Sequence, residues 1–523
     1  MTEYLHPGVY IEEIERGPRP IEGVPTSTAA FIGETERGSI KPRLVTSYKE
    51  FQRWFGGVFT GETGDTKYLP YAVNGFFENG GARLYIARVI GDAAETAFVT
   101  ERPYTLRAAG AGEWGNRIWA YISPSSTERL DPDTKKLVPV GFRLRLAYWN
   151  SIDVKNMFNP FLEANKDKLK VRPPSLTEDF NDLVLNEASP DFYQKRLLES
   201  SALAVLERDP AAAFDPAQGL DKALTGGVDD TSARTDTDYK GEPTANRPKE
   251  QGLAALALDP YRDVSLMYAP AVDTNTAKAI VIHCETLRFR FAVIDSEKTF
   301  GSLTDIEPRS LVTDTQFAAY YYPWISVSDP QTGARKTVPP GGHVLGVYAR
   351  TDTERGVFKA PANEILRGAI ELAADINDAQ QDQLNPRGVN ITRSFAGRGI
   401  RVWGARTLSS NALWKYVSVR RLFIFLERSI YEGTQWVVFE PNDARLWARV
   451  VDTITLFLRT QWRLGALFGR TEAEAYFVKC DESTMTQDDI LNGRLICEIG
   501  IAPVRPAEFV IFRIFQNTAD TPS

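Results

Sequence analysis

Residues 264–269 (VSLMYA) and 289–294 (FRFAVI) are two short runs of apolar, β-prone residues, and Thr276 to Arg288 between them has a helical pattern. Strands that alternate with helices indicate an α/β layer. These residues therefore predict a strand, a helix and a second strand that belong to one α/β core.

A second block with the same alternation lies near the N-terminus. Ala29–Gly33 (AAFIG) and Ala82–Val89 (ARLYIARV) are strand-like, and Ser47–Phe55 and Tyr68–Asn79 between them have helical patterns. The pair Gly80–Gly81 is expected to end the second of these helices. We expect the two blocks to share one sheet, so the predicted fold class is mixed α/β.

The middle of the chain differs from both blocks. Trp119–Ile122 and Gly141–Trp149 are strand-like, whereas residues 146–250 are polar, rich in proline and irregular. Asp229–Gln251 contains hardly any apolar residues, and such a composition cannot bury enough surface to offset the entropy of ordering the chain. We expect this segment to be an exposed loop or the tip of an insertion.

The last third of the chain is dense in aromatic residues and helix signals. We expect a helix over residues 361–374, a strand over Trp414–Val419, a helix over Arg420–Glu432 and the longest helix over Asn442–Gly465. An apolar stripe at helical spacing predicts which face of the longest helix is buried. The residues of that stripe are Leu446, Val450, Ile454, Phe457, Leu458 and Leu464.

Four arginines lie opposite this apolar stripe: Arg445, Arg449, Arg459 and Arg463. Most charged stripes are the solvated face of an amphipathic helix. In an acidic protein, a cationic face is also a suitable docking surface for an acidic partner. Both interpretations stay open, and the second makes these arginines candidate contacts.

Both ends of the chain carry short β-prone runs that prolines and glycines separate from the rest. The residues concerned are Val9, Tyr10, Ile11 and Ile14 at the start, and Phe509, Ile511, Phe512 and Phe515 within residues 508–516 at the end. The C-terminal run is apolar on both faces, so we expect a strand that is covered on both sides. Either these strands fold back into the chain's own sheet, or they add to a sheet of a neighbouring subunit as extended arms.

The bulk composition excludes several classes of protein. A chain of 523 residues exceeds the size of a single core, so two or more domains are expected. With 61 Lys and Arg against 68 Asp and Glu, the net charge of -7 argues against a general nucleic-acid or anionic-membrane binder. The sequence shows neither a signal peptide nor a run long enough to span a membrane, so we expect synthesis and assembly in a cytoplasm.

Residues suited to catalysis or metal binding are scarce. The three histidines do not pair at metal-ligand spacing, and the sequence contains no phosphate-binding loop and no nucleophile elbow. The three cysteines (Cys284, Cys480 and Cys497) have no CxxC spacing, which fits a reducing compartment and excludes a disulfide framework. We therefore expect neither a cofactor nor an enzymatic activity.

Nine short motifs, in order along the chain, resemble those of the tail sheath proteins of contractile phage tails and phage-tail-like injection systems. They are 5–13 (LHPGVYIEE), 25–33 (PTSTAAFIG), 79–89 (NGGARLYIARV), 321–324 (YYPW), 339–346 (PPGGHVLG), 356–363 (GVFKAPAN), 385–390 (NPRGVN), 403–407 (WGART) and 416–422 (YVSVRRL). The resemblance covers both ends and most of residues 260–523, and it is absent between about 110 and 255.

This resemblance implies a structural role. Such subunits polymerise as stacked hexameric rings around an inner tube, and their terminal arms add strands to neighbouring subunits. Contraction then drives the tube through a target envelope. The implied partners are other copies of the chain, the inner tube protein, and baseplate and terminal cap proteins, with no direct contact to nucleic acid and no insertion into a membrane. The implied location is a phage tail, a bacteriocin or another tail-like particle.

The resemblance and the composition together divide the chain into six parts. They are an N-terminal arm (1–25), the first part of the α/β core (26–109), a variable outward-facing insertion (110–255), the second part of the core (256–340), a C-terminal sheath domain (341–500) and a C-terminal strand arm (501–523).

An enzyme is the alternative from a different functional class. The block that begins near residue 260 is similar to a Rossmann-type unit, whose sites lie at strand ends. That interpretation places a site near Asp263 and Asp295.

Overall fold

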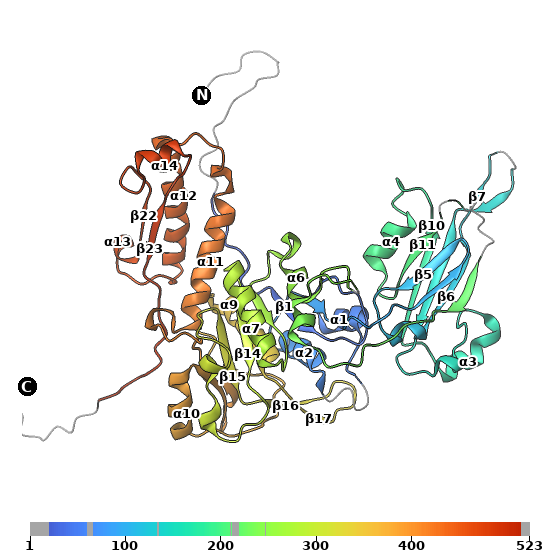
Figure 1. The fold of residues 1–523 in the computed structure, drawn as a ribbon, viewed down its shortest axis with the longest axis horizontal. Helices are drawn as coiled ribbons and strands as arrows, with labels where there is room; N and C mark the ends of the chain where they lie inside the picture. The colour runs from blue at the N-terminus through green and yellow to red at the C-terminus, as the bar shows by residue number, and fades with distance from the viewer. Residues whose placement is uncertain are drawn as a thin grey trace, which may run out of the picture. The chain divides into compact units, whose positions relative to one another are not determined.

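The computed structural model describes residues 20–59, 66–132, 135–209, 211, 219–245 and 247–513. The chain forms two compact units, which are coloured by residue number in Figure 1. We call Thr26–Glu354 with Pro361–Val417 the sheet unit, and Met1–Pro25, Arg355–Ala360 and Ser418–Ser523 the terminal unit.

A nine-stranded sheet forms the centre of the sheet unit. Its strands follow the order β18-β21-β20-β15-β14-β13-β1-β3-β2. They are β18 (Glu364–Ile365), β21 (Gly399–Val402), β20 (Val389–Phe395), β15 (Ala318–Tyr322), β14 (Phe291–Asp295), β13 (Leu266–Tyr268), β1 (Ala29–Gly33), β3 (Leu84–Arg88) and β2 (Arg43–Val45). The central strands pair in parallel, and the pairs at both ends of the sheet are antiparallel. The two blocks predicted from the sequence therefore do share one sheet.

Helices cover both faces of this sheet (Figure 1). On one face, Ala30 of β1 packs in one apolar cluster with Ile280 of α7 (Thr274–Leu287) and Leu256 of α6 (Gly252–Leu256). On the other face, the Phe31 ring lies 5.3 Å from the Phe76 ring of α2 (Leu69–Glu78). Neighbouring residues of β1 point to opposite faces, so its run of small and apolar residues is explained by burial on both sides.

A helix that the sequence analysis did not predict packs beside α2. Helix α9 (Gly341–Arg355) begins with two glycines, and a Cβ atom on Gly342 would lie 2.6 Å from the Cα atom of Ala72. Glycine lowers the helix propensity of a sequence, but here it allows two helices to approach closely. The helix expected over residues 361–374 is wrong, because the short strands β18 and β19 (Glu371–Leu372) occupy this region.

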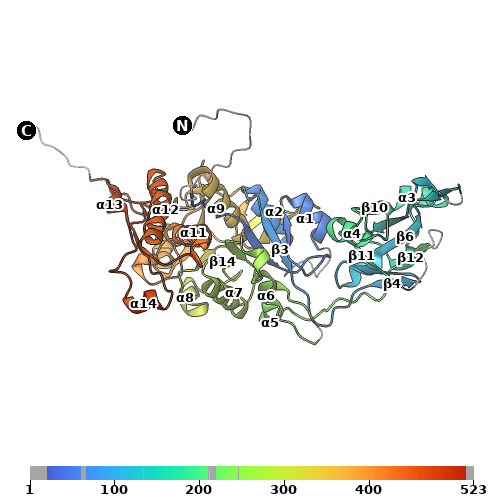
Figure 2. The ribbon, with the colours of Figure 1, turned by 90° about the horizontal axis from the view of Figure 1, so that it is seen from above.

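The insertion is a separate β-structure with its own core (Figure 2). A four-stranded sheet, β10-β9-β6-β12, lies with a three-stranded sheet, β11-β5-β4. The strands are β4 (Phe98–Glu101), β5 (Tyr104–Ala108), β6 (Ile118–Pro124), β9 (Phe142–Tyr148), β10 (Leu176–Leu183), β11 (Ala204–Arg208) and β12 (Leu220–Ala223). The expected strands near residues 119 and 141 are β6 and β9. Because β5 packs in this core, the insertion begins before residue 110.

Polar contacts join the insertion to the sheet core. The Tyr148 hydroxyl at the end of β9 donates a hydrogen bond to Glu36, and the Arg37 guanidinium lies 5.2 Å from the centre of the Tyr148 ring. At the end of α4 (Tyr193–Ser200), the Ser200 carbonyl accepts a hydrogen bond of 3.1 Å from Arg53. The junction therefore has several polar connections besides the chain itself.

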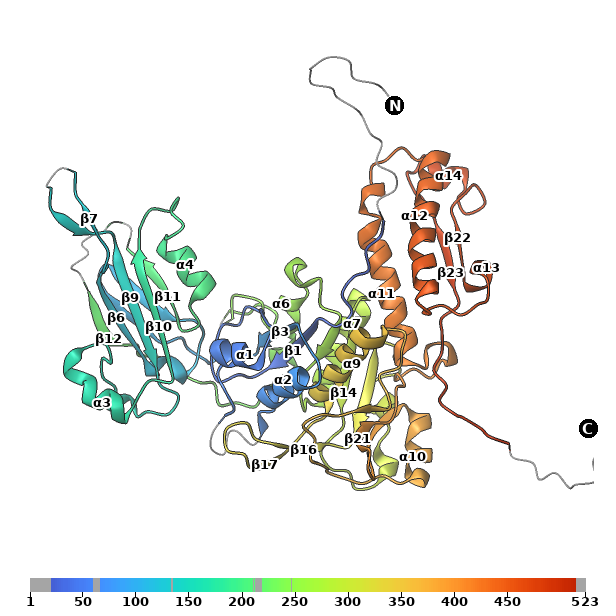
Figure 3. The same ribbon diagram turned by 180° about the vertical axis from the view of Figure 1, so that it is seen from behind.

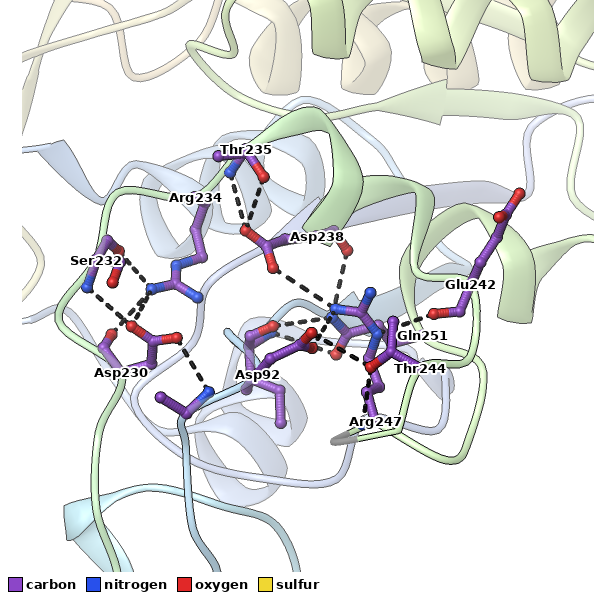
Figure 4. A network of polar contacts seen from close by, with 12 residues as sticks. Asp92, Asp230, Ser232, Arg234, Thr235, Asp238, Glu242, Thr244, Arg247 and Gln251 are labelled. Carbon is purple, nitrogen blue, oxygen red and sulfur yellow. Dashed lines mark hydrogen bonds and ion pairs between the residues drawn. The ribbon is translucent and has the colours of Figure 1, made fainter.

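The polar segment 229–251 is largely exposed, as expected, but it is not the tip of the insertion. Figure 4 shows that two arginines anchor it. Arg234 is paired with Asp230 at 3.2 Å, and its side chain is only 5% exposed. Arg247, whose side chain is 4% exposed, lies 3.0 Å from Asp92 and 3.5 Å from Asp238 of α5 (Asp236–Lys240).

The end of this segment is fixed by a fully buried amide. The Gln251 side chain donates a 2.8 Å hydrogen bond to the carbonyl of Ile90, just after β3, and a second of 3.2 Å to the carbonyl of Asp238. Composition correctly indicated exposure here, but it gives no sign of the buried arginines that hold the segment against the end of β3.

We predict that Arg247→Met opens this segment locally. Removing one guanidinium from its two carboxylates should lower the free energy of local opening by about 2 kcal/mol, which is roughly a 30-fold increase in amide exchange. Hydrogen-exchange mass spectrometry of residues 235–251 measures this change. The control is Lys249→Met at an exposed position, where exchange should stay near that of the native chain. Equal exchange in both variants would show that Arg247 is not the anchor.

Candidate assembly site

The terminal unit is built on two long helices that lie side by side in Figures 1 and 3. They are α11 (Val417–Gly433) and α12 (Ala444–Arg463). Asp443 caps α12, because its carboxylate accepts hydrogen bonds from the backbone N–H groups of Arg445 and Leu446 at 3.0 and 2.9 Å. The strand expected over residues 414–419 is wrong, because Trp414 ends a short 3-10 helix, Tyr416 forms an isolated bridge with Arg406, and α11 begins at Val417.

The predicted apolar stripe of α12 is buried, apart from its last member. Its buried residues pack with Leu422 and Leu426 of α11 in one cluster. Leu464 is 63% exposed, because the helix ends at Arg463 and the chain turns away there. The buried members are Leu446, Val450, Ile454, Phe457 and Leu458.

The four candidate arginines share one face of α12, but their surroundings differ. Arg445 and Arg463 are exposed. Arg449 lies 4.6 Å from the centre of the Trp436 ring and 4.0 Å from the Glu440 carboxylate. Arg459 forms a 2.9 Å ion pair with Glu472 of α13 (Glu472–Ala475).

Glu472 was not recognised in the sequence as a partner of this stripe. The Tyr476 hydroxyl and then Arg459 lower the pKa of its carboxyl group, so the pair stays charged over a wide pH range. The two middle arginines of the stripe, Arg449 and Arg459, therefore each face a carboxylate, whereas Arg445 and Arg463 are exposed at its two ends.

A two-stranded antiparallel sheet stands next to α12 in the terminal unit (Figure 3). Its strands are β22 (Tyr476–Lys479) and β23 (Glu498–Ile501), and within the described residues each pairs with the other alone. A two-stranded sheet is only marginally stable, and its outer edges carry unpaired backbone groups. This sheet is therefore able to accept further strands.

The described part of the C-terminal arm does not supply such a strand within the chain. Residues 508–513 are in no strand, and the side chains of Phe509, Ile511 and Phe512 are 71%, 79% and 84% exposed. One of the two alternatives for this arm was that it folds back into the chain's own sheet. Residues 508–513 do not pair in this way. The candidate arm residues Val9, Tyr10, Ile11, Ile14 and Phe515 lie outside the described residues.

The segment that follows the N-terminal arm is fixed to α11. The Val24 N–H donates a 3.1 Å hydrogen bond to the Ser429 hydroxyl, and Ile21 is buried. A Cβ atom on Gly433, the last residue of α11, would lie 2.7 Å from the Ile21 side chain, so a larger residue here would displace Ile21. The sequence does not predict this anchor, because nothing in residues 20–25 identifies its partner.

The enzyme alternative is not supported, because its two carboxylates are far apart along neighbouring strands. Asp263 precedes β13, whereas Asp295 is the last residue of β14, and these strands run in parallel with Leu266 opposite Phe291. Asp263 therefore lies at the amino ends of these neighbouring strands and Asp295 at their carboxyl ends. Asp263 is occupied by a 2.9 Å ion pair with Arg83.

Asp295 has a structural role at the start of α9. Its carboxylate accepts hydrogen bonds from the Tyr268 hydroxyl at 2.7 Å, from the Gly341 N–H at 2.9 Å and from the Ala271 N–H at 3.3 Å. Burial nevertheless raises the pKa of Asp295 to about 7, against the lowering effect of these three donors. These three hydrogen bonds connect the end of β14 to β13 and to the start of α9, so they stabilise the fold.

The described residues contain no group of three or more His, Cys, Asp or Glu side chains that is placed to hold a metal ion. None of the helices in that part of the chain has the length and apolar character needed to cross a membrane.

Comparison with known proteins gives consistent results. The model of the phage tail sheath protein central domain matches residues 237–408, and that of the phage tail sheath C-terminal domain matches residues 409–517. The tail sheath protein of Burkholderia phage BcepMu is 30% identical over 520 residues, which are 95% of this chain and 93% of that protein.

Two further similarities are more distant. A tail sheath protein of Vibrio phage KVP40 is 26% identical over 37% of this chain, and the match spans only 28% of that longer protein. The sheath of an extracellular contractile injection system, PVC, solved in the contracted state, has a similar fold, with a TM-score of 0.58, 24% identity and 99% coverage of both chains.

We predict that Asp295→Asn flattens the dependence of stability on pH. The pKa of Asp295 is raised in the folded state, so the folded state binds the proton more tightly than the unfolded state. Its contribution is therefore complete below the ordinary aspartate pKa and is lost as the pH rises through about 7.

Urea denaturation of the native chain at pH 5 and at pH 8 should reveal this loss, which amounts to about 2 kcal/mol for this group. The Asp295→Asn variant should lack it. The control is Asp263→Asn, which should keep the pH dependence of the native chain. If all three proteins respond alike to pH, Asp295 does not titrate in this range.

Proposed function

Because the chain belongs to the phage tail sheath protein family, we propose that it is a structural subunit of a contractile sheath. In this proposal it polymerises as stacked hexameric rings around an inner tube and contracts to drive the tube through a target envelope. The observation that carries the proposal is similarity to a phage tail sheath protein along nearly the whole chain. An open two-stranded sheet and an exposed apolar arm support it from the structure.

The work of contraction needs no catalysis in this proposal. Energy is stored as a difference in packing between two assembled states of the same chain, and it is released when a trigger removes the kinetic barrier. The proposed subunit is therefore not an enzyme and needs no cofactor. Its proposed partners are other copies of the chain, the inner tube, and baseplate and terminal cap proteins.

Strand addition is the proposed link between subunits. An added strand pairs its backbone with an open edge and places alternate side chains on the two faces of the sheet. Phe509, Ile511 and Phe512 are exposed in the single chain, and the sheet β22-β23 offers open edges. We propose that this sheet receives arms from neighbouring subunits, with Val9, Tyr10, Ile11 and Ile14 in one arm and the C-terminal run with Phe515 in the other.

The cationic face of α12 is the proposed contact with the inner tube. Arg445 and Arg449 are exposed on this face, and Leu456, which is 45% exposed, lies between them and Arg459 and Arg463. An acidic tube surface would pair with these guanidinium groups. Exposed ion pairs are worth only about 0.2 to 1 kcal/mol each, so such a contact holds through repetition and still breaks during contraction.

We further propose that the insertion faces outward from the cylinder. It has its own core, and the strands of its two sheets, residues 98–223, lie before the region matched by the sheath domain models, which starts at residue 237. The subunit would be synthesised and assembled in a cytoplasm and become part of a phage tail or tail-like particle.

We predict that the arms are required for assembly and not for folding. The full chain, incubated with its inner tube partner, should form long cylinders in negative-stain images. Deletion of residues 1–20 or 507–523 should give a soluble monomer with a near-normal melting transition, because both deletions spare Ile21 and the helices of the terminal unit.

Deletion of residues 517–523 is the matched control, since it shortens the C-terminus but keeps the apolar run. This variant should still form cylinders. Normal cylinders from either arm deletion, or an unfolded body, would contradict strand addition between subunits. Failure of the full chain to polymerise with its tube would contradict the sheath function itself.

We predict that Arg445→Glu/Arg449→Glu separates polymerisation from tube binding. Reversed charges would repel an acidic tube, so the variant should polymerise in the contracted form without a tube inside. Cryo-electron microscopy measures the helical rise and the tube content of the particles. The control is Lys155→Glu/Lys195→Glu, two exposed positions of the insertion with the same change in charge. If the arginine variant forms extended particles that contain a tube, the cationic face of α12 is a solvated surface and does not bind the tube.

A further inference from the structure

Two of the three cysteines, which are far apart in the sequence, meet in the terminal unit. Cys480 follows β22 directly, and Cys497 directly precedes β23. The last pair of this ladder is Lys479 opposite Glu498, so the next position places Cys480 opposite Cys497. Their side chains interact with each other. Cys284 lies apart from them, buried in α7 of the sheet unit.

The position of the pair within the ladder favours a cross-link. The Ala502 N–H donates a 2.9 Å hydrogen bond to the Ala475 carbonyl, so Ala502 directs its backbone N–H group toward the partner strand at this position of the ladder. Pairs alternate along an antiparallel ladder, so Cys480 and Cys497 occupy a non-hydrogen-bonded position. Cα atoms are about 4.5 Å apart there, within the range of about 4.4 to 6.8 Å that a disulfide spans.

We propose that Cys480 and Cys497 form a cross-strand dithiol that oxidises reversibly to a disulfide, with a small-molecule disulfide such as oxidised glutathione as the oxidant. The proposal does not depend on the sheath function. It concerns a hairpin whose two strands already hold the sulfur atoms opposite each other before any bond forms.

The reaction is two successive thiol–disulfide exchanges. Cys497 is half-buried and Cys480 is 5% exposed, so Cys497 reacts first. Its thiolate attacks one sulfur of the oxidant, a mixed disulfide forms, and one thiolate leaves. The Cys480 thiolate then attacks the Cys497 sulfur and expels the second thiolate. The two protons released by the cysteines are taken up by the two leaving thiolates.

The surroundings of the pair make this reaction slow at neutral pH. Burial, followed by the neighbouring Cys480 and the Glu498 carboxylate, raises the pKa of Cys497 to about 12. Burial and the Asp481 carboxylate raise the pKa of Cys480, against the effect of Cys497. Because the thiolate is the reacting species, the dithiol persists in a reducing compartment and closes during longer exposure to oxidant.

The disulfide would close the loop 481–496, which carries α14 (Gln487–Leu491). A cross-link restricts the unfolded chain, and one that closes a loop of this length is expected to raise the Tm of the terminal unit by about 5 °C or more. The same bond would fix the register of β22 against β23. If this sheet accepts arms from other subunits, oxidation would also stiffen the acceptor.

Thiol counting on the full-length protein tests the proposal. The reduced protein is incubated with oxidised glutathione at mildly alkaline pH, denatured and alkylated. Of its three cysteines, Cys284 alone should remain alkylatable. Before alkylation, the intact mass should be lower than that of the reduced protein by two hydrogen atoms, and peptide mapping should find Cys480 joined to Cys497.

Variants separate this outcome from general oxidation. Cys284→Ser should still lose two thiols, whereas Cys480→Ser should keep a stable mixed disulfide with glutathione on Cys497. Three alkylatable thiols in the treated native chain would overturn the proposal. Cross-linked dimers that a reducing agent dissociates would also overturn it, since they would show that the cysteines react between chains. Neither result requires a variant to fold.

Discussion

Unpaired backbone groups at strand edges are the constraint on which this structure depends, because each N–H and C=O group needs a partner. The sheet unit meets it by ending its sheet in very short antiparallel strands, Arg43–Val45 at one end and Glu364–Ile365 at the other. Within the described residues of the terminal unit, the sheet stops after two strands of four residues each. The described residues therefore include a wide sheet that ends in short strands and a two-stranded sheet suited to extension.

Buried charges anchor segments whose composition is too polar for a hydrophobic core. Arg234 and Arg247 each face carboxylates from distant parts of the sequence, and Gln251 pairs with Ile90 through its side chain. Such groups cost energy to desolvate, so they are retained only where several partners satisfy them together. The result is a polar surface segment with a fixed path, whose free energy of opening depends on a few guanidinium groups.

The sequence predicted the elements whose signals are local. The strand and helix blocks around β1 and β13, the helix α12 and its buried stripe follow from periodicity alone. It missed α9, because the glycines that weaken its helix propensity are required by the close approach of Ala72. It also missed the partners Glu472 of Arg459 and Ser429 of Val24, since contacts between distant residues leave no local pattern.

Two kinds of contact with different strengths are available to a subunit that must change its packing without losing its neighbours. Side-chain pairs on an exposed helix face are weak and depend on geometry, so a rotation of one subunit against another breaks them. Strand pairing uses backbone groups that every residue has, and an extended arm tolerates movement of the body that it leaves. In this chain the two kinds are separated: the arginines lie on α12, whereas the exposed apolar residues lie in an arm beyond the last strand. Contacts that must break and contacts that must persist can therefore be built from different parts of one small unit.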